Sequence, residues 1–456
     1  MPLARVLVFS LPRMAAPVFA AALLAATSFA GRPQLNEAPP APEPAAKSQL
    51  ALVAEAVPSG FVVDPASREA SRIFFRTVYA ASENVPSGWN GNVATGNAGT
   101  TSATFKEAVQ RRVNYFRAMA GVSAGITFDT TYNTKDQKAA LMMSANNSLS
   151  HAPPTTWTYY TGDGADAAGH SNIFLGSFGP AAVTGYIEDF GSPNASAGHR
   201  RWILYPQTRK MGSGDIPPTD AYESANALWV ATPDYGTTRP AVRDEFVAWP
   251  PPGFVPYSLV FPRWSFTYPG ADFSNATVTM QRGGANVAVA IENRGPGAGE
   301  ASLVWTWDHL NSNAEMPPGP PPAADTAVQV AVNGVVINGQ SRNFSYTVTL
   351  FDPQQAGADT VLAVASGPAQ PIVGASAAYT CNAVPNASGY QFRTAPLSAL
   401  TAIESAEGGT TNVTVDAPTG AALVSAAYHA TGTKSFHFTT PQFDHQAITL
   451  KRTVLA

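Results

Sequence analysis

The sequence contains a single cysteine, Cys381, among its 456 residues. One cysteine cannot form an intrachain disulfide, so a disulfide framework and a zinc site built on several cysteines are both excluded. Charged residues are also scarce, at 13% of the chain against roughly 25% in typical globular domains. The formal net charge is −4, and the lack of a basic excess argues against a nucleic-acid partner.

Several common catalytic motifs are missing as well. The sequence has no HExxH zinc helix, no GxSxG nucleophile elbow, and no glycine fingerprint for phosphates or dinucleotides between a strand and a helix. Apolar residues nevertheless make up 45% of the chain, which is enough for more than one core. The content of 37 glycines and 39 prolines favours β-domains with long loops.

The N-terminal residues follow the pattern of a secretory signal peptide. Arg5 and Arg13 precede a short apolar run over 14–26, and small residues follow that run. The alternative is a membrane anchor, but the run falls short of the roughly 20 residues needed to span a bilayer, and Pro17 interrupts it. We therefore predict a signal peptide over 1–30, no transmembrane segment after its cleavage, and a secreted or cell-envelope protein, more typical of bacteria than of animals.

The pattern of apolar residues changes twice along the remaining chain. A helical pattern gives way to alternating strands after the proline run that follows Trp249, and a second block of short strands begins near residue 371. We predict an α+β multidomain chain with five parts: a signal peptide (1–30), a Pro/Ala-rich linker (31–66), a helical domain (67–240), a β-sandwich (241–356), and a second β-sandwich or jelly-roll-like domain (371–456). We expect the helical domain to fold without the residues after about 240.

Local signals divide the helical domain into elements. A TxxE capping box opens a helix over 104–120, and a TxxQ pattern opens a second helix over 134–147. A proline in the first turn predicts a third helix over 180–189. The segments 200–216 and 226–232 are predicted to be extended.

Two hairpins are predicted in the first β-region. One turns at Gly283-Gly284, and the other turns at Asn333-Gly334, between strands of alternating apolar residues. Aromatic residues recur along these strands and could form sugar-binding platforms, but alternating positions favour a core. They are Trp249, Phe254, Tyr257, Phe261, Trp264, Phe266, Tyr268, Trp305 and Trp307.

Histidines and one acid gather in the helical domain. His151, His170 and His199 fall within 49 residues, and Asp189 lies ten residues before the last of them. Such a set could form a metal site or an acid–base pair. Alternatively, each histidine forms local hydrogen bonds and holds a loop. Arg200 and Arg201 could bind an anion or a glycan; in a strand, by contrast, one would face the interior or an acid and the other the solvent.

Several segments together resemble the CAP superfamily, which includes cysteine-rich secretory proteins, antigen 5 and plant pathogenesis-related group-1 proteins. The resemblance covers about residues 70–215, a third of the chain, and is of the bacterial type. The matching segments, in the family's order, are VNYFRAMAGV (113–122), FD (128–129), LSH (149–151), GHSNI (169–173), YIED (186–189) and GHRRW (198–202).

The resemblance implies an α-β-α sandwich with a central cleft that holds two histidines and two acids. Carried onto this sequence, the histidines are His151 and His199, and one acid is Asp189. The other acid position is Ser171, although its neighbour His170 could contribute instead. The implied ligand cleft therefore contains all five residues, and His151 and His199 would be the metal ligands. An acid introduced at position 171 would be expected to strengthen metal binding.

We expect an exported, non-enzymatic CAP-like module that recognises an extracellular or cell-envelope ligand, such as a lipid, a glycan or a protein. No cofactor is required by this hypothesis. A divalent metal such as zinc could bind to the neutral histidines above roughly pH 6.5. The alternative is a metal-assisted hydrolase using His151, His199 and Asp189 as catalytic residues. A third hypothesis is an envelope structural or adhesion protein.

Overall fold

The structure is a computed structural model, and it describes residues 33–42, 60–316 and 319–355 together with the backbone of short strands further on. The predicted signal peptide lies outside the described residues. Within the described part of the chain, no helix is long and apolar enough to cross a membrane.

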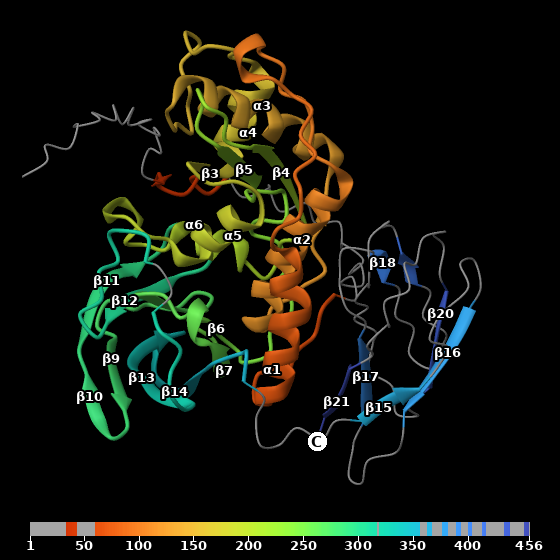
Figure 1. Cartoon of the computed structure of the whole chain (residues 1–456). Coiled ribbons are helices and arrows are strands. Elements are labelled where there is room, and N and C mark those ends of the chain that lie inside the picture. The colour runs from red at the N-terminus through yellow and green to blue at the C-terminus, as the bar shows by residue number, and fades with distance from the viewer. Residues whose placement is uncertain are drawn as a thin grey trace, which may run out of the picture.

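The first sheet lies between two layers of helices (Figure 1). Its five strands have the order β1-β3-β5-β4-β2. Helices α3 and α4 cover one face, and α2, α5 and α6 cover the other, which gives the predicted α+β architecture. The strands are β1 Gln34–Leu35, β2 Thr127–Phe128, β3 Ser171–Leu175, β4 Lys210–Ile216 and β5 Ala225–Trp229. The helices are α1 Arg68–Phe74, α2 Ala103–Met119, α3 Thr130–Asn146, α4 Gly162–His170, α5 Gly179–Glu188 and α6 Gly198–Ile203. Short helical turns lie at Phe75–Tyr79, Ala80–Ser82, Val93–Thr95, Ser192–Asn194 and Tyr257–Leu259.

The helix starts differ from the predicted ones. Helix α2 is capped by Ser102, whose Oγ accepts a hydrogen bond from Phe105 N at 3.2 Å, rather than by the predicted Thr104. Helix α3 is capped by Asp129, so its predicted start at Thr134 lies one turn inside the helix. In both helices a residue before the predicted cap accepts hydrogen bonds from backbone N–H groups of the first turn. These N–H groups have no partner within the helix, so the helix begins at the earlier residue.

The segment 198–203 is a short helix, so its predicted extended conformation is wrong. The backbone N–H of Leu204 donates to Arg200 O, as a helical turn requires. Arg200 and Arg201 are both buried, and neither faces solvent as the strand interpretation required. Trp202 is fully buried.

Part of the expected linker belongs to the first sheet. Residues Gln34–Leu35 form β1, which pairs antiparallel with Leu175 and Phe174 of β3. Leu35 is buried in the hydrophobic core, which explains why this stretch lies on the domain despite its Pro/Ala-rich surroundings.

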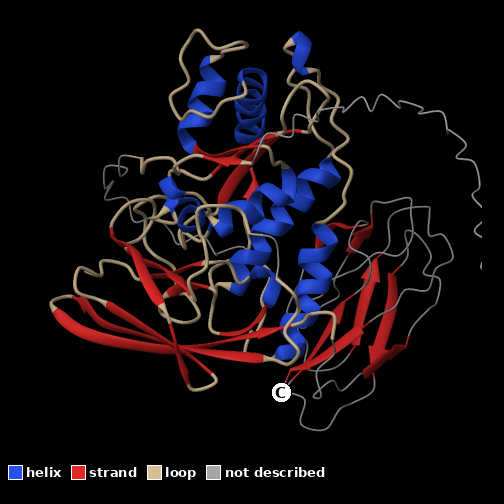
Figure 2. Cartoon of the chain, turned by 60° about the vertical axis from the view of Figure 1, so that its left-hand side comes forward, coloured by secondary structure: helices blue, strands red, loops and turns tan. Residues whose placement is uncertain are grey.

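Residues 247–351 form two further sheets, the two-sheet region, seen as the long strands of Figure 2. The sheets have the strand orders β10-β9-β13-β14-β7 and β11-β12-β8-β6. Aromatic rings of the two sheets pack against each other. The ring centroids of Phe266 in β8 and Phe344 in β14 are 5.1 Å apart. The strands are β6 Val247–Trp249, β7 Gly253–Pro256, β8 Arg263–Thr267, β9 Thr277–Arg282, β10 Ala285–Val287, β11 Val289–Gly295, β12 Ser302–Trp307, β13 Thr326–Ile337 and β14 Gln340–Phe351. Trp249, Trp264 and Trp305 are fully buried, in agreement with the core interpretation.

The hairpin of β13 and β14 turns later than predicted. Asn333-Gly334 lies inside β13, where the register shifts in a bulge. The turn is made by Asn338-Gly339, with φ of 51° and 77°. The sequence offers two Asn-Gly pairs, and pairing of Val335–Ile337 with Gln340–Arg342 selects the second one.

Further strands follow the two-sheet region. They are β15 Ala363–Ser366, β16 Ser376–Cys381, β17 Gly389–Arg393, β18 Leu400–Ile403, β19 Val413–Val415, β20 Thr433–His437 and β21 Lys451–Leu455. β16 to β21 lie in the block of short strands that the sequence predicts from about residue 371.

Two separate hydrophobic clusters fill the first domain. The cluster beneath α3 and α4 contains residues of that layer and of the sheet, such as Leu141, Ile173 and Trp229. The cluster around α2 and α5 continues into the two-sheet region. Phe116 of α2 meets Trp249 of β6 edge to face, with ring centroids 5.0 Å apart.

Candidate functional site

Asp189 and His199 form a buried pair where α5 ends and α6 begins. Asp189 follows the last residue of α5 in the left-handed conformation (φ 60°), which Asp tolerates better than most residues. Its Oδ1 lies 2.8 Å from His199 Nδ1, and its Oδ2 accepts a hydrogen bond from Arg200 N at 3.1 Å. Both side chains are fully buried, so the imidazole is held in one orientation.

The other contacts of His199 leave one ring nitrogen without a partner. Its ring stacks on Tyr186, with centroids 5.5 Å apart, and its carbonyl oxygen accepts from Asn172 Nδ2 at 3.1 Å. Among the described residues, His199 Nε2 and Asn172 Oδ1 are both buried without a hydrogen-bond partner. Such orphaned polar atoms are rare in folded proteins and indicate a place where a small polar group can be accommodated.

Ser171 does not lie with His199. Its Oγ donates to Asp136 Oδ1 of α3 at 2.7 Å, whereas Asn172, the next residue of β3, contacts His199. Successive strand residues face opposite sides, so Ser171 faces the α3 layer, away from His199. Burial raises the pKa of Asp136 well above its usual value, although hydrogen bonds from Ser171 and from Trp229 N oppose the shift.

His170 also lies on the α3 side of the sheet. Its ring stacks on Trp229 at 4.8 Å, and its Nδ1 lies 2.8 Å from Asp166 O and 3.3 Å from Asp166 Oδ1. His170 therefore forms local hydrogen bonds and is separate from the Asp189–His199 pair.

His151 is held between two carbonyl oxygens. Its Nδ1 lies 2.6 Å from Ala168 O, and its Nε2 lies 2.6 Å from Glu37 O. Carbonyl oxygens only accept, so both contacts are hydrogen bonds only when the ring is protonated. Burial lowers the pKa of His151, the two carbonyl contacts oppose this, and the charge of His199 lowers it further. The two histidines are therefore close enough to interact.

An open groove of about 760 Å³ runs past His151. The chain segment 36–41 lines it together with Leu149, Ser150, His151, Pro193, Ser196 and Gly198. Gly297 and Ala298 of the two-sheet region complete the lining. Gly198 lines the groove, whereas its sequence neighbour His199 is fully buried and does not line it.

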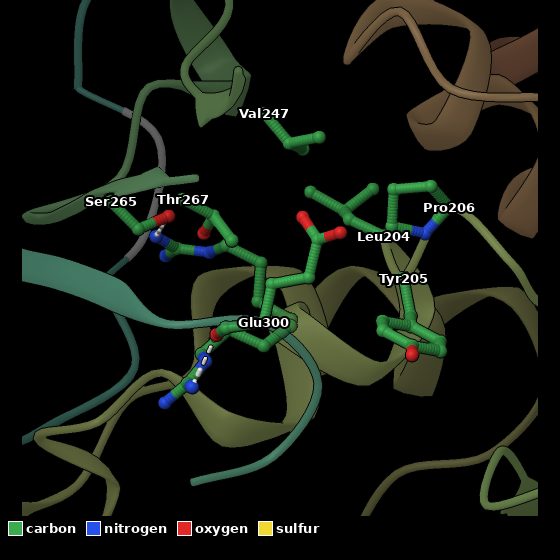
Figure 3. Close-up of a pocket in the computed structure, with 9 residues that line it drawn as sticks. Leu204, Tyr205, Pro206, Val247, Ser265, Thr267 and Glu300 are labelled. Carbon is green, nitrogen blue, oxygen red and sulfur yellow. Dashed lines mark hydrogen bonds between the residues drawn. The ribbon is translucent and has the colours of Figure 1, made fainter. Parts of the chain in front are cut away.

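A second cavity lies between α6 and the two-sheet region, lined by Leu204, Tyr205, Ser265, Thr267 and Glu300 among others (Figure 3). Its volume of about 10 Å³ is enough for roughly one water molecule, so it is no ligand site.

The two arginines after His199 join the domain to the two-sheet region. Arg200 Nε donates to Ile187 O at 2.6 Å, and its Nη2 donates to Arg263 O at 2.8 Å. Arg201 Nη2 donates to Glu300 O at 2.5 Å. Both guanidinium groups are thus engaged by backbone oxygens, which leaves the anion or glycan hypothesis without support in this structure.

The residues present do not fit a protein-held zinc ion in this arrangement. Within the described chain, no group of three or more His, Cys, Asp or Glu side chains could hold a metal ion. His199 offers only Nε2, and His151 would first have to give up a carbonyl contact. A catalytic zinc needs three protein ligands and an open position, so we derive no step through a metal.

Residues 110–230 match the family model of CAP, the cysteine-rich secretory protein family. This segment of the chain is similar to the CAP family. The match extends from α2 through β5, and it includes His151, Asp189 and His199. It therefore supports the resemblance found in the sequence.

The other comparisons add nothing to the CAP assignment. No curated protein matches the sequence. Among solved structures, the full ectodomain (Ig1–Ig3) of mouse nectin-like molecule 4 aligns at 9% identity, over 51% of this chain and 83% of that chain. Its TM-score of 0.12 is too low to indicate a shared fold.

Sequence reasoning missed two contributors to the site, Asn172 and the segment 36–41, and it missed Asp136, the partner of Ser171 on the opposite face of the sheet. Asn172 was visible only as part of the GHSNI segment, and its contact with His199 depends on the face that the strand presents. Asp136 carries no motif signal. The groove wall at 36–41 was hidden by its Pro/Ala-rich composition, which is typical of a spacer.

Proposed function

We propose that the protein is an exported, non-enzymatic module whose CAP domain binds an extracellular or cell-envelope ligand in the groove beside His151. The signal-peptide pattern of residues 1–30 supports export. The observation that carries the proposal is the groove itself, which lies on the matched domain and ends at the two-sheet region.

The lining of the groove favours binding over catalysis. Small and apolar side chains line it together with the polar residues Asn36, Glu37, Ser150, His151 and Ser196. Binding sites typically combine an apolar lining with a few placed polar groups that orient the ligand. The Asp189–His199 pair is fully buried and does not line the groove, and Asp189 Oδ2 accepts a hydrogen bond from Arg200 N in α6.

A hydrolase remains the alternative, and one observation favours it. An imidazole oriented by a carboxylate, with its second nitrogen unpartnered, has the arrangement of a general base. We would test it by measuring hydrolysis of ester and peptide substrates by the wild type and His199→Ala at pH 5.5 and 7.5. We expect no hydrolysis by either protein. Hydrolysis at pH 7.5 that His199→Ala abolishes would favour the hydrolase instead.

The groove is tested by filling it. Ser196→Trp places a large ring on the groove wall, whereas Thr156→Trp adds the same ring at an exposed position outside it. The purified exported protein and both variants would be measured against lipid vesicles, glycans and peptides. We expect Ser196→Trp to weaken binding of the recognised class by about tenfold or more, and Thr156→Trp to leave it unchanged. Equal binding by all three proteins would exclude the groove.

A further inference from the structure

The segment 33–42 crosses the CAP domain in an extended conformation and contacts it mainly through its backbone. It begins as β1, which adds to the edge of the sheet by pairing with Leu175 and Phe174 of β3. Leu35 O accepts a hydrogen bond from Asn194 Nδ2 at 3.3 Å. An edge strand presents unpaired backbone groups, which an added extended chain satisfies.

Two side chains of the CAP domain continue this recognition beyond the strand. His151 Nε2 contacts Glu37 O at 2.6 Å, and Trp202 Nε1 donates to Pro39 O at 2.9 Å. Trp202 is fully buried, so Pro39 O gives its indole N–H the partner that a buried donor requires. Between these contacts the chain passes close to Gly198, where a side-chain Cβ would approach Ala38 Cβ to 2.7 Å.

The segment buries only selected side chains. Leu35 and Pro39, four residues apart, are buried against the domain, whereas Gln34, Glu37 and Pro40 are exposed. The contacts therefore select an extended backbone with an aliphatic residue and a proline at this spacing. Main-chain pairing supplies affinity and alternate pockets supply specificity when a peptide adds to a sheet edge.

We propose that β3, His151 and Trp202 form a docking surface for an extended peptide with an aliphatic residue four positions before a proline. Residues 33–42 occupy this surface in cis, so an external peptide binds only in exchange for them. The proposal rests on the proposed function, because it names the ligand class of the groove that the same segment borders.

The test uses the full chain and a fluorescent peptide of residues 31–43, GRPQLNEAPPAPE. Leu35→Asp in the protein places a charge at a buried position and should release the segment, whereas Gln34→Asp makes the same change at the exposed neighbour. We expect fluorescence anisotropy to show the peptide binding Leu35→Asp at least about tenfold more tightly than the wild type or Gln34→Asp. Equally weak binding to all three would overturn the proposal.

Variants of the peptide keep the test independent of protein folding. The peptide with Leu35→Asp should lose binding to the Leu35→Asp protein, and the peptide with Gln34→Asp should keep it. If that protein does not fold, a specific protease site placed between residues 43 and 59 of the wild type allows the segment to be cut free and exchanged for labelled peptide. A cut protein that never exchanges its segment, or that loses cooperative melting with it, would show a permanent strand and overturn the proposal.

The outcomes separate this inference from the proposed function. Suppose that the peptide of residues 31–43 does not bind, but a lipid or glycan does and Ser196→Trp weakens that binding. The peptide proposal then fails, and the groove remains a binding site. If no ligand class is sensitive to Ser196→Trp, the proposed function fails as well.

Discussion

The two helical layers of the CAP-like domain differ in whether their hydrophobic core stays within the domain. Beneath α3, the core is closed within the domain, and its buried polar groups find partners there: Asp136 accepts from Ser171 Oγ and Trp229 N. Beneath α2, α5 and α6, the core continues into the two-sheet region through Phe116 and Trp249. One layer is completed by its own sheet, whereas the other is completed by a neighbouring part of the chain.

The difference shows that the matched family segment is smaller than the folding unit. Arg200, at the α6 face, donates to Arg263 O and Ser265 Oγ of β8 as well as to carbonyl oxygens of α5. Without β8 this fully buried guanidinium would lose partners in an apolar setting, which is costly. The layer that holds the Asp189–His199 pair is therefore the one that depends on the two-sheet region.

Truncation should have the largest effect, because it removes one side of this shared core. A polypeptide of residues 31–240 should show no cooperative melting, and one of residues 31–355 should melt cooperatively. The expectation drawn from the sequence, that the helical domain folds without the residues after about 240, is thereby reversed. Thermal unfolding followed by circular dichroism decides, and a sharp transition of 31–240 at the temperature of 31–355 would restore the earlier expectation.

Ser171→Glu tests the layer beneath α3 and α4, whose core is closed within the domain. The new carboxylate would lie beside fully buried Asp136 instead of near His199, so it should destabilise the fold by about 3 kcal/mol or more rather than strengthen metal binding. Ser171→Ala, the matched control, loses one hydrogen bond and should cost about 1 kcal/mol. Urea unfolding measures both changes. A stable Ser171→Glu protein that binds zinc would place position 171 in the cleft after all.

Glu188 should make the stability of the layer formed by α2, α5 and α6 depend on pH. Burial raises its pKa from 4.5 to about 7, against a hydrogen bond from Met316 N. A carboxyl whose pKa is raised on folding stabilises the native state below about pH 4.5, and this stabilisation is lost as the pH rises to about 7. Glu188→Gln should remove that decline and make the protein more stable than the wild type at pH 8, by at most about 3 kcal/mol. Unfolding free energies at pH 5 and 8 check the sign, and parallel pH profiles of the two proteins would contradict it.

The smallest effect concerns the start of α2, the helix that carries Phe116. Ser102→Ala removes the observed cap and should cost about 1 kcal/mol, whereas Thr104→Ala, at the cap expected from the sequence, should cost a few tenths, of order 0.3 kcal/mol. Denaturant midpoints distinguish the two. Equal losses would mean that both hydroxyls cap the helix.

The sequence predicted well those elements whose signal is local and periodic. A capping-box pattern located α2, a proline in the first turn located α5, strand alternation located the buried tryptophans, and the motif order located His151, Asp189 and His199. It failed where distant residues decide. Residues 198–203 have too few positions for a period, and their helical turn is held by bonds from Arg200 to β8.

The errors at the site have the same origin. Whether Ser171 or Asn172 faces His199 depends on the register of β3 between its neighbours, which no motif encodes. The pairing of β1 joins residues some 140 positions apart, so a Pro/Ala-rich composition gave no hint of it.

The contact between Asp189 and His199 also determines which ring nitrogen of His199 is left without a hydrogen-bond partner. A carboxylate oxygen only accepts, so the shared hydrogen belongs to His199 Nδ1. When Nε2 carries no proton, this buried atom is an electron-pair donor without a partner among the described residues. A molecule that reaches it must bring a hydroxyl, an amide N–H or a positive charge, and a purely accepting group would be repelled. Asp189→Asn, whose amide can donate, would invert that preference while leaving the turn in place.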